Sequence, residues 1–204
     1  EPVTLSILSF VGIIWAINLF NFLDGIDGFI GMETAFIALA AFALFGNELL
    51  LILAAAILGF LILNWHPAKI FMGDVGSTFL GFLFAVFCIH YNNLGESSVF
   101  TWLILSGLFW FDATYTLYRR WRNGENLSVA HKKHAYQRMV QSGFSHQKTT
   151  LYALLVNLLL FAPLALTFYY NMEHLIFIVF LADLTILFLI MKWVDRKKSF
   201  LETQ

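Results

Sequence analysis

The stretch that separates the first two apolar runs of this chain is Asn-Phe-Leu-Asp-Gly-Ile-Asp-Gly, residues 21–28. Its carboxylates stand out because the 204-residue chain is 60% hydrophobic and only 12% charged, with a mean hydropathy of +0.77. An ordinary soluble domain is about half apolar and about a quarter charged. The composition therefore predicts a polytopic membrane protein. In such a protein, a charged side chain at the edge of the hydrocarbon core usually has a functional role.

Further apolar segments extend on both sides of this stretch, each close to the roughly 20 residues that a membrane-spanning helix needs. Helices are expected because backbone groups find no water in lipid. We predict an all-α polytopic membrane helix bundle with about seven transmembrane helices, in which residues 1–204 form a single membrane domain. The predicted spans are 3–19, 28–45, 49–65, 77–91, 99–118, 149–170 and 174–194.

Lysine and arginine are confined to alternate connections of this predicted bundle. All 12 of them fall within residues 20–27, 66–76 and 119–148 or in the tail that starts at residue 192. Because positive residues favour the cytoplasmic side of a membrane, we predict that these connections face the cytoplasm. Both aspartate-bearing connections and the basic loop 119–148 can then converge on one site, which would receive a soluble substrate and a membrane-held one.

The first polar connection carries Asn21, Asp24 and Asp27 at a spacing of three. On a helical turn, this spacing places the three side chains roughly on one face. The glycines Gly25 and Gly28 would leave that face open to close approach. Helix capping is the structural alternative, but it accounts for one polar residue rather than three. The pattern therefore favours a functional site.

The second polar connection, residues 69–77, places Asp74 just before the predicted start of the next helix. A helix N-terminus attracts phosphate, and Mg²⁺ favours carboxylate oxygens shared with phosphates. We expect Asp74 to hold Mg²⁺, with Mn²⁺ as an alternative; a helix cap is the structural explanation. Lys69 could pair with a phosphate or simply mark the cytoplasmic edge. Phe71 could stack on a base or contact lipid.

The third polar connection, the basic loop 119–148, contains His131 and His134 with two lysines between them. Neighbouring lysines would oppose a bound cation, so the pair suits a pyrophosphate better than a metal ion. A segment that touches anionic lipid headgroups is the alternative. Asp112 is expected to form an ion pair with Arg119, and no role is assigned to Asp183 in the last predicted span.

Together these segments resemble the polyprenyl-phosphate N-acetylhexosamine-1-phosphate transferases. Residues 21–28 match the family's asparagine–aspartate motif, and residues 67–77 match its metal-site motif almost letter for letter. The resemblance implies transfer of a sugar-1-phosphate from a UDP-N-acetylhexosamine to a polyprenyl phosphate, with release of UMP. This would be the first membrane step of surface-glycan or cell-wall biosynthesis, on the cytoplasmic face of the bacterial plasma membrane.

The resemblance also implies roles for individual residues. Asp74 would ligate Mg²⁺, Phe71 would stack on uracil, and His131 would approach the diphosphate. The predicted catalytic residues are Asp74, Asp27 and His131, and the predicted substrate-binding residues are Asn21, Asp24, Asp27, Lys69, Phe71 and His134. The expected partners are the lipid bilayer and the two substrates but no nucleic acid, and a homodimer is left open.

Two departures from the family pattern matter. The family's upstream pair of aspartates is not found in residues 1–204, so we expect this chain to be the C-terminal part of a longer transferase and incomplete alone. The family's histidine-rich motif appears here as His131-Lys-Lys-His134-Ala-Tyr-Gln, a form that looks like the subgroup that initiates O-antigen-type or related surface-glycan chains. A cation-coupled transporter is the main rival, and a non-catalytic assembly subunit is the third interpretation.

Overall fold

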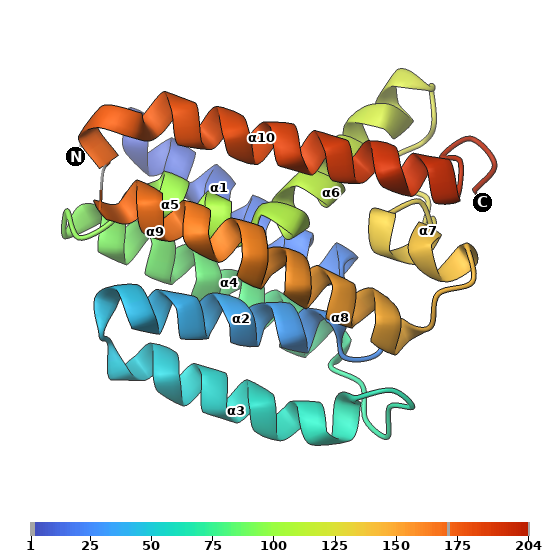
Figure 1. The fold of residues 1–204 in the computed structure, drawn as a ribbon, viewed down its shortest axis with the longest axis horizontal. Coiled ribbons are helices and arrows are strands. Elements are labelled where there is room, and N and C mark those ends of the chain that lie inside the picture. Colours follow the sequence, from blue (N-terminus) through green and yellow to red (C-terminus); the bar gives the residue numbers. More distant parts are fainter. Residues whose placement is uncertain (1–2, 171, 204) are drawn as a thin grey trace.

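A computed structural model describes residues 3–170 and 172–203 of the chain. These residues form helices and connections, and no strand occurs among them (Figure 1). The helices are α1 (Val3–Phe22), α2 (Phe29–Phe45), α3 (Glu48–Asn64), α4 (Gly73–Asn93), α5 (Val99–Leu105), α6 (Gly107–Arg122), α7 (Ala135–Gln141), α8 (His146–Val156), the π-helical turn η1 (Asn157–Phe161), α9 (Ala162–Tyr170) and α10 (Met172–Lys197). The all-α prediction is confirmed.

Among the residues that the structure describes, four helical stretches are long and apolar enough to cross a membrane. They are α1, α4, the continuous stretch from α8 to α9 (His146–Tyr170) and most of α10 (Phe177–Lys197). Helices α2 and α3 are also apolar but have 17 residues each, which is near the lower limit for a span. The chain is an integral membrane protein, and the expected count of about seven spans stays a prediction beyond these four.

The predicted span over 99–118 is interrupted. Helix α5 ends at Leu105, and α6 begins at Gly107 after a bend at Ser106. The Ser106 hydroxyl donates a hydrogen bond of 2.7 Å to the carbonyl of Trp102, so the bend keeps its polar groups paired. Helix α6 extends beyond the predicted end at residue 118 and ends at Arg122. The added last turn carries three arginines.

Helix α1 packs antiparallel along α4, with the end of α1 beside the start of α4. The contact is close at Gly81, where a Cβ atom would lie 2.5 Å from the carbonyl oxygen of Ala16. Only glycine permits this approach of two backbones. The packing therefore fixes which polar residues of the two helices meet at their shared end.

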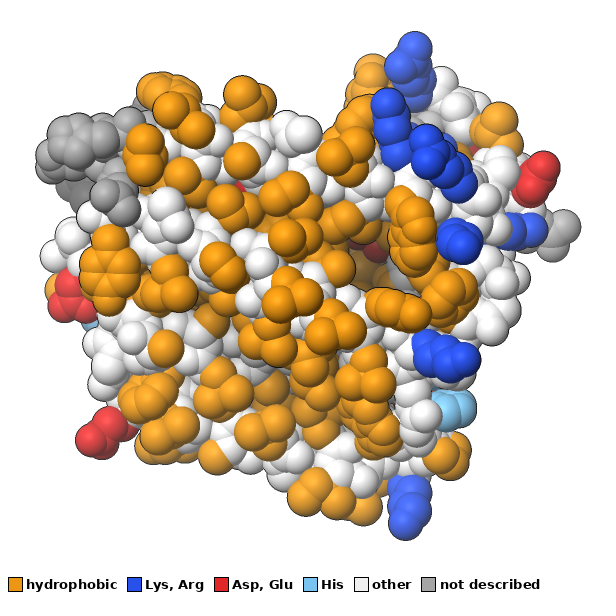
Figure 2. Space-filling model, in the orientation of Figure 1, with side chains coloured by type: hydrophobic (Ala, Val, Ile, Leu, Met, Phe, Trp, Pro, Cys, Tyr) orange, Lys and Arg blue, Asp and Glu red, His pale blue; other side chains and the backbone are white. Residues whose placement is uncertain are grey.

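Basic side chains gather at the right-hand end of the visible face, and apolar side chains cover its middle (Figure 2). In Figure 1 the same end holds α7, the C-terminal residues and the connections after α1 and α3. Many apolar side chains of the described residues are exposed, including Ile62 at 79% and Phe177 at 86%. An exposed apolar belt with a basic end is typical of a membrane protein.

Candidate functional site

Segments far apart in the sequence meet at the basic end of the bundle. The side chain of Asn21 contacts Asp74, the hydroxyl of Tyr136 bonds to the carbonyl of Phe22, and Asp27 contacts His66. The connection after α1 therefore touches the connection before α4 and the basic loop 119–148. This loop contains the short helix α7.

Asn21 lies in the last turn of α1 and faces the first turn of α4. Its amide nitrogen Nδ2 donates to Asp74 Oδ1 at 3.1 Å and to the Ser77 hydroxyl at 3.3 Å. The expectation that Asp74 precedes its helix is wrong, because α4 begins at Gly73. Gly73 has φ +66°, a left-handed value that favours glycine, and it turns the chain into the helix before Asp74. Asp74 thus occupies the first turn of α4.

Asp24 lies next to Asp74. Burial raises the pKa of Asp24, and the negative charge of Asp74 raises it further, against a hydrogen bond from the backbone of Gly73. A divalent cation bound between two neighbouring carboxylates can offset the electrostatic repulsion that opposes their ionisation. Oxygen ligands of this kind suit a hard cation, so Asp24 and Asp74 fit Mg²⁺.

Asp27 does not share a face with Asn21 and Asp24, so the prediction of three side chains on one helical face is wrong. Helix α1 ends at Phe22, and residues 23–28 turn away from the helical path. Gly28 closes this turn with φ +74°. A helical spacing of three aligns side chains only while the helix continues. The described contacts of the Asp27 carboxylate are instead with the ends of other helices.

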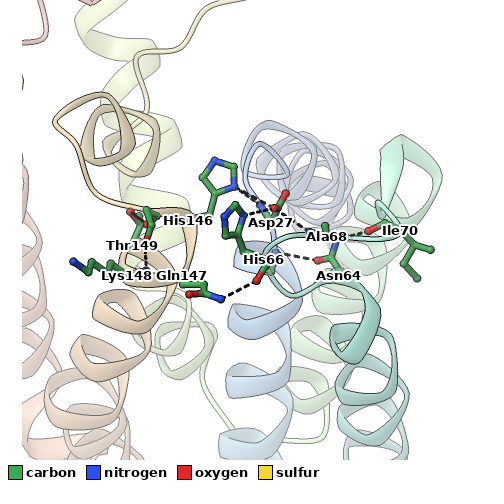
Figure 3. A network of polar contacts seen from close by, with 11 residues as sticks. Asp27, Asn64, His66, Ala68, Ile70, His146, Gln147, Lys148 and Thr149 are labelled. Carbon is green, nitrogen blue, oxygen red and sulfur yellow. Dashed lines mark hydrogen bonds and ion pairs between the residues drawn. The ribbon is translucent and has the colours of Figure 1, made fainter.

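The carboxylate of Asp27 faces two histidines (Figure 3). Oxygen Oδ2 lies 2.6 Å from Nδ1 of His66 and 3.4 Å from Nδ1 of His146, and it accepts a hydrogen bond of 3.2 Å from the backbone of Ala68. Burial acts to raise the pKa of Asp27, but the hydrogen bonds from His66 and Ala68 and the proximity of His146 hold it below its usual value. Asp27 is therefore ionised at neutral pH.

The two histidines are functional candidates that sequence reasoning missed. His66 follows α3, whereas His146 begins α8, and 80 positions separate them in the chain. His146 has no neighbouring motif, and His66 directly precedes the motif segment 67–77 without being part of it, so only the fold brings the two histidines together. Their ring centroids are 4.9 Å apart. The available signal was that both lie in connections that already contained basic or acidic groups.

Amide side chains hold this cluster in place. Gln147 donates 2.7 Å to the backbone carbonyl of His66, which ties α8 to the end of α3. Asn64 accepts a hydrogen bond of 3.1 Å from the backbone of Gly28 and donates 2.8 Å to the carbonyl of Ile70 (Figure 3). The geometry around Asp27 is thus fixed from three separate segments.

His134 is buried in the wall between the basic loop and α1. Its ring stacks between Phe22 and Tyr136, at centroid distances of 6.3 and 6.0 Å. Only 2% of the residue is exposed, which favours a positioning role over the predicted contact with substrate. The ring of His131 lies 4.9 Å from that of His134. His134 can therefore position the half-buried His131.

His131 is neutral at physiological pH. Burial lowers its pKa to about 4, and electrostatic interactions with His134 and Arg120 act in the same direction. Lys133 is engaged by Glu125 at 2.9 Å, and Glu125 also accepts from Arg120 at 3.1 Å. His131 can therefore offer a hydrogen bond to a phosphate, but not a full positive charge.

The expected ion pair between Asp112 and Arg119 is wrong. Arg119 pairs with Asp195 of α10 at 2.9 Å, because α10 packs against α6 on that side. Asp112 instead accepts two hydrogen bonds from the backbone of Ala135, at 2.9 and 2.8 Å, and one from Thr116 at 3.0 Å. Asp112 thus anchors the start of α7 and holds the histidine segment against the bundle.

Lys69 and Phe71 lie on the exposed segment between His66 and Asp74. Phe71 is 75% exposed, and Lys69 is exposed as well. The backbone of Lys69 bonds to the carbonyl of Leu63 at 2.7 Å, which ties the segment to the end of α3. Both side chains are free to meet a ligand, and their roles stay predictions.

Comparison with known proteins agrees with the polar motifs. The family model described as glycosyl transferase family 4 matches residues 1–92. A probable undecaprenyl-phosphate N-acetylglucosaminyl 1-phosphate transferase of Bacillus subtilis is 37% identical over 162 residues, which cover 74% of this chain and 44% of that protein. A decaprenyl-phosphate N-acetylglucosaminephosphotransferase of Mycobacterium tuberculosis is 33% identical over 164 residues, covering 66% and 40%.

A phospho-N-acetylmuramoyl-pentapeptide-transferase of Vesicomyosocius okutanii is 43% identical over 105 residues, covering 41% of this chain and 29% of that protein. The chain thus spans less than half the length of the curated relatives that it matches. The matched part includes both glycine–aspartate connections, because the family model runs through residues 21–28 and 67–77. The chain is thus similar to glycosyl transferase family 4 over residues 1–92 and to the Bacillus subtilis protein over 162 residues.

Proposed function

We propose that this chain contributes to an enzyme that transfers a sugar-1-phosphate from a UDP-N-acetylhexosamine to a polyprenyl phosphate and releases UMP. The observation that carries the proposal is the junction of Asn21, Asp24 and Asp74 at the end of the bundle where basic side chains gather. The names of the relatives, which specify polyprenyl phosphates and N-acetylglucosamine phosphate transfer, support the same chemistry.

Asp74 and Asp24 are the residues that would hold Mg²⁺, with Mn²⁺ as the alternative. When bound, the ion would supply Lewis-acid stabilisation to a diphosphate. Asn21 orients the Asp74 carboxylate through its 3.1 Å hydrogen bond. The first turn of α4 adds free backbone N–H groups, which favour phosphate oxygens. These groups would bind and position the diphosphate of the sugar nucleotide.

His131 would donate a hydrogen bond to a phosphate oxygen, since it is neutral and half-buried. Lys69 would add positive charge, and Phe71 would stack on uracil from its exposed position. In phosphoryl transfer, positioning and electrostatic stabilisation supply most of the rate enhancement. The proposed work of these residues is therefore to orient two substrates rather than to form covalent intermediates.

The proposed location is the cytoplasmic face of a bacterial plasma membrane. The exposed apolar belt would contact the bilayer, which also holds the prenyl chain, and the basic end would face the cytoplasm. The match to the glycosyl transferase family 4 model and the names of the relatives favour a transferase over a cation-coupled transporter. A non-catalytic assembly subunit remains the alternative that an activity assay decides.

The test uses the complete protein that contains this chain, purified in a membrane mimetic. It is given polyprenyl phosphate, Mg²⁺ and radiolabelled UDP-N-acetylhexosamines, and label in the lipid fraction is followed together with UMP. Asp74→Asn should abolish transfer, whereas Glu96→Gln, on an exposed residue beyond the far end of α4, should leave it unchanged. Failure to transfer any of these sugars would contradict the proposed function.

A further inference from the structure

Asp27, His66 and His146 bring two imidazole nitrogens and a carboxylate oxygen together outside the Asp24–Asp74 pair. These three ligand atoms lie within 4.8 Å of one another. We propose that they form a binding site for a divalent transition-metal ion of the zinc type. Imidazole ligands favour zinc and its neighbours, whereas Mg²⁺ prefers oxygen alone. The proposal is independent of the proposed transferase activity.

The orientation of the histidines suits metal binding. Nδ1 of His146 accepts a hydrogen bond of 3.3 Å from the backbone N–H of Asp27, so its lone pair points toward the cluster. Nδ1 of His66 lies 2.6 Å from the carboxylate. A tetrahedral zinc site with bonds of about 2.0 Å has ligands about 3.3 Å apart. The ligand atoms therefore need only small displacements to enclose an ion.

Hydrogen bonds from neighbouring side chains hold the backbone around these candidate ligands in place. Gln147 fixes the backbone at His66 through the His66 carbonyl, and Asn64 fixes the backbone beside Asp27 through the N–H of Gly28. Such outer contacts orient metal ligands and raise affinity. The side chains of Asp27, His66 and His146 are 15%, 38% and 30% exposed, so an ion can enter and a fourth position stays open to water.

A bound ion would join three segments at the basic end. Asp27 belongs to the turn after α1, His66 to the connection after α3, and His146 to the first residue of α8. The connection after α3 also carries Phe71 and leads to Asp74. The ion would therefore clamp the segment that borders the proposed substrate site, without being the Mg²⁺ of that site.

The test measures zinc binding directly. The complete protein, purified with a tag that lacks histidine and stripped with a chelator, is titrated with Zn²⁺ against a chromogenic chelator in buffer without Mg²⁺. We expect a saturable site of about one ion per copy of this chain, which His146→Gln weakens at least about tenfold. His90→Gln, at the opposite end of α4, should leave affinity unchanged.

A second variant separates lost ligation from lost folding. His146→Cys replaces one zinc ligand with another and should retain binding that His146→Gln loses. Size-exclusion profiles and thermal unfolding of each variant report folding. The proposal is overturned if the stripped protein takes up no stoichiometric zinc, or if His146→Gln binds zinc as well as His90→Gln while both remain folded.

Discussion

Asp24 and Asp27 lie three positions apart in one short turn, yet they belong to two chemically different sites. Asp24 faces the carboxylate of Asp74, and burial with this like charge raises its pKa. Asp27 faces His66 and His146, and its pKa is held below the usual value. The difference teaches that the partners brought by the fold, rather than the motif itself, decide what each carboxylate can bind.

The cause of the divergence is the geometry of the turn. Helix α1 ends at Phe22, and Gly28 adopts φ +74° immediately before α2. A side chain at Gly28 would also meet the ring of Trp65 at 3.1 Å. The chain thus reverses within a few residues and presents Asp24 and Asp27 to different helices.

The largest expected effect distinguishes the two sites by activity. Asp74→Asn removes a carboxylate from the proposed Mg²⁺ site and should lower the rate of sugar-phosphate transfer by about 10²-fold or more, as loss of a preorganised electrostatic contact does. His66→Gln alters only the histidine cluster and should cost far less. Initial rates at saturating Mg²⁺ provide the measurement. Equal losses in the two variants would show that the sites act as one.

The next prediction concerns the contact between Gly25, in the turn after α1, and Tyr136, in the basic loop 119–148. In Gly25→Ala the new methyl group would lie 2.1 Å from the Tyr136 hydroxyl, so the hydrogen bond of this hydroxyl to Phe22 would be displaced. We expect a loss of about 1–3 kcal/mol in stability, as for other overpacked sites. Thermal unfolding measures it.

Gly59→Ala is the matched control for this change. Gly59 lies in α3 and a Cβ atom there has nothing within 4 Å. Alanine in a helix is favoured over glycine by about 0.5–1 kcal/mol, so the control should be neutral or stabilising. A Gly25→Ala protein as stable as this control would show that the Tyr136 contact is not required.

A smaller effect is expected for Phe71, on the exposed segment between the two sites. If it stacks on uracil, Phe71→Ala should raise KM for the UDP-sugar about tenfold with little change in kcat, because stacking on a base contributes about 1–3 kcal/mol. Phe71→Trp should retain the low KM. An unchanged KM in Phe71→Ala would leave lipid contact as the role of this side chain.

The smallest effect concerns the protonation of His131. Its pKa of about 4 lies below the ordinary value of about 6.5. The unfolded chain therefore binds more protons between these values, and the stability due to neutral His131 is lost as pH falls through that window. Nitrogen NMR of ¹⁵N-histidine-labelled protein, with His131→Gln to assign the signal, should find His131 neutral at pH 5.5. A protonated signal at that pH would contradict the buried environment.

The helical architecture and the junction of Asn21 with Asp74 were accessible from the sequence, because long apolar runs predict helices and each motif lies at a helix end. The cluster of Asp27 with His66 and His146 was not accessible. Its members come from three distant segments, and the turn that redirects Asp27 breaks the helical spacing on which the prediction relied.

The partner of Asp112 was missed for a related reason. Spacing along one helix suggested Arg119, but that arginine is drawn to Asp195 on α10, and Asp112 bonds to the backbone of Ala135. Such tertiary partners depend on how helices pack, which periodicity alone does not specify. The start of α4 was misplaced because Gly73, rather than Ser77, turns the chain into the helix.

The central claim is that the turn after α1 contributes carboxylate ligands to two separate cation sites. A competition between two ions tests this claim most directly. Mn²⁺ bound to the complete protein is followed by electron paramagnetic resonance while Zn²⁺ is added. We predict that one equivalent of Zn²⁺ binds without releasing Mn²⁺, that Asp74→Asn loses only Mn²⁺, and that His146→Gln loses only high-affinity Zn²⁺. Release of Mn²⁺ by Zn²⁺ one for one, or loss of both ions in either folded variant, would contradict the claim.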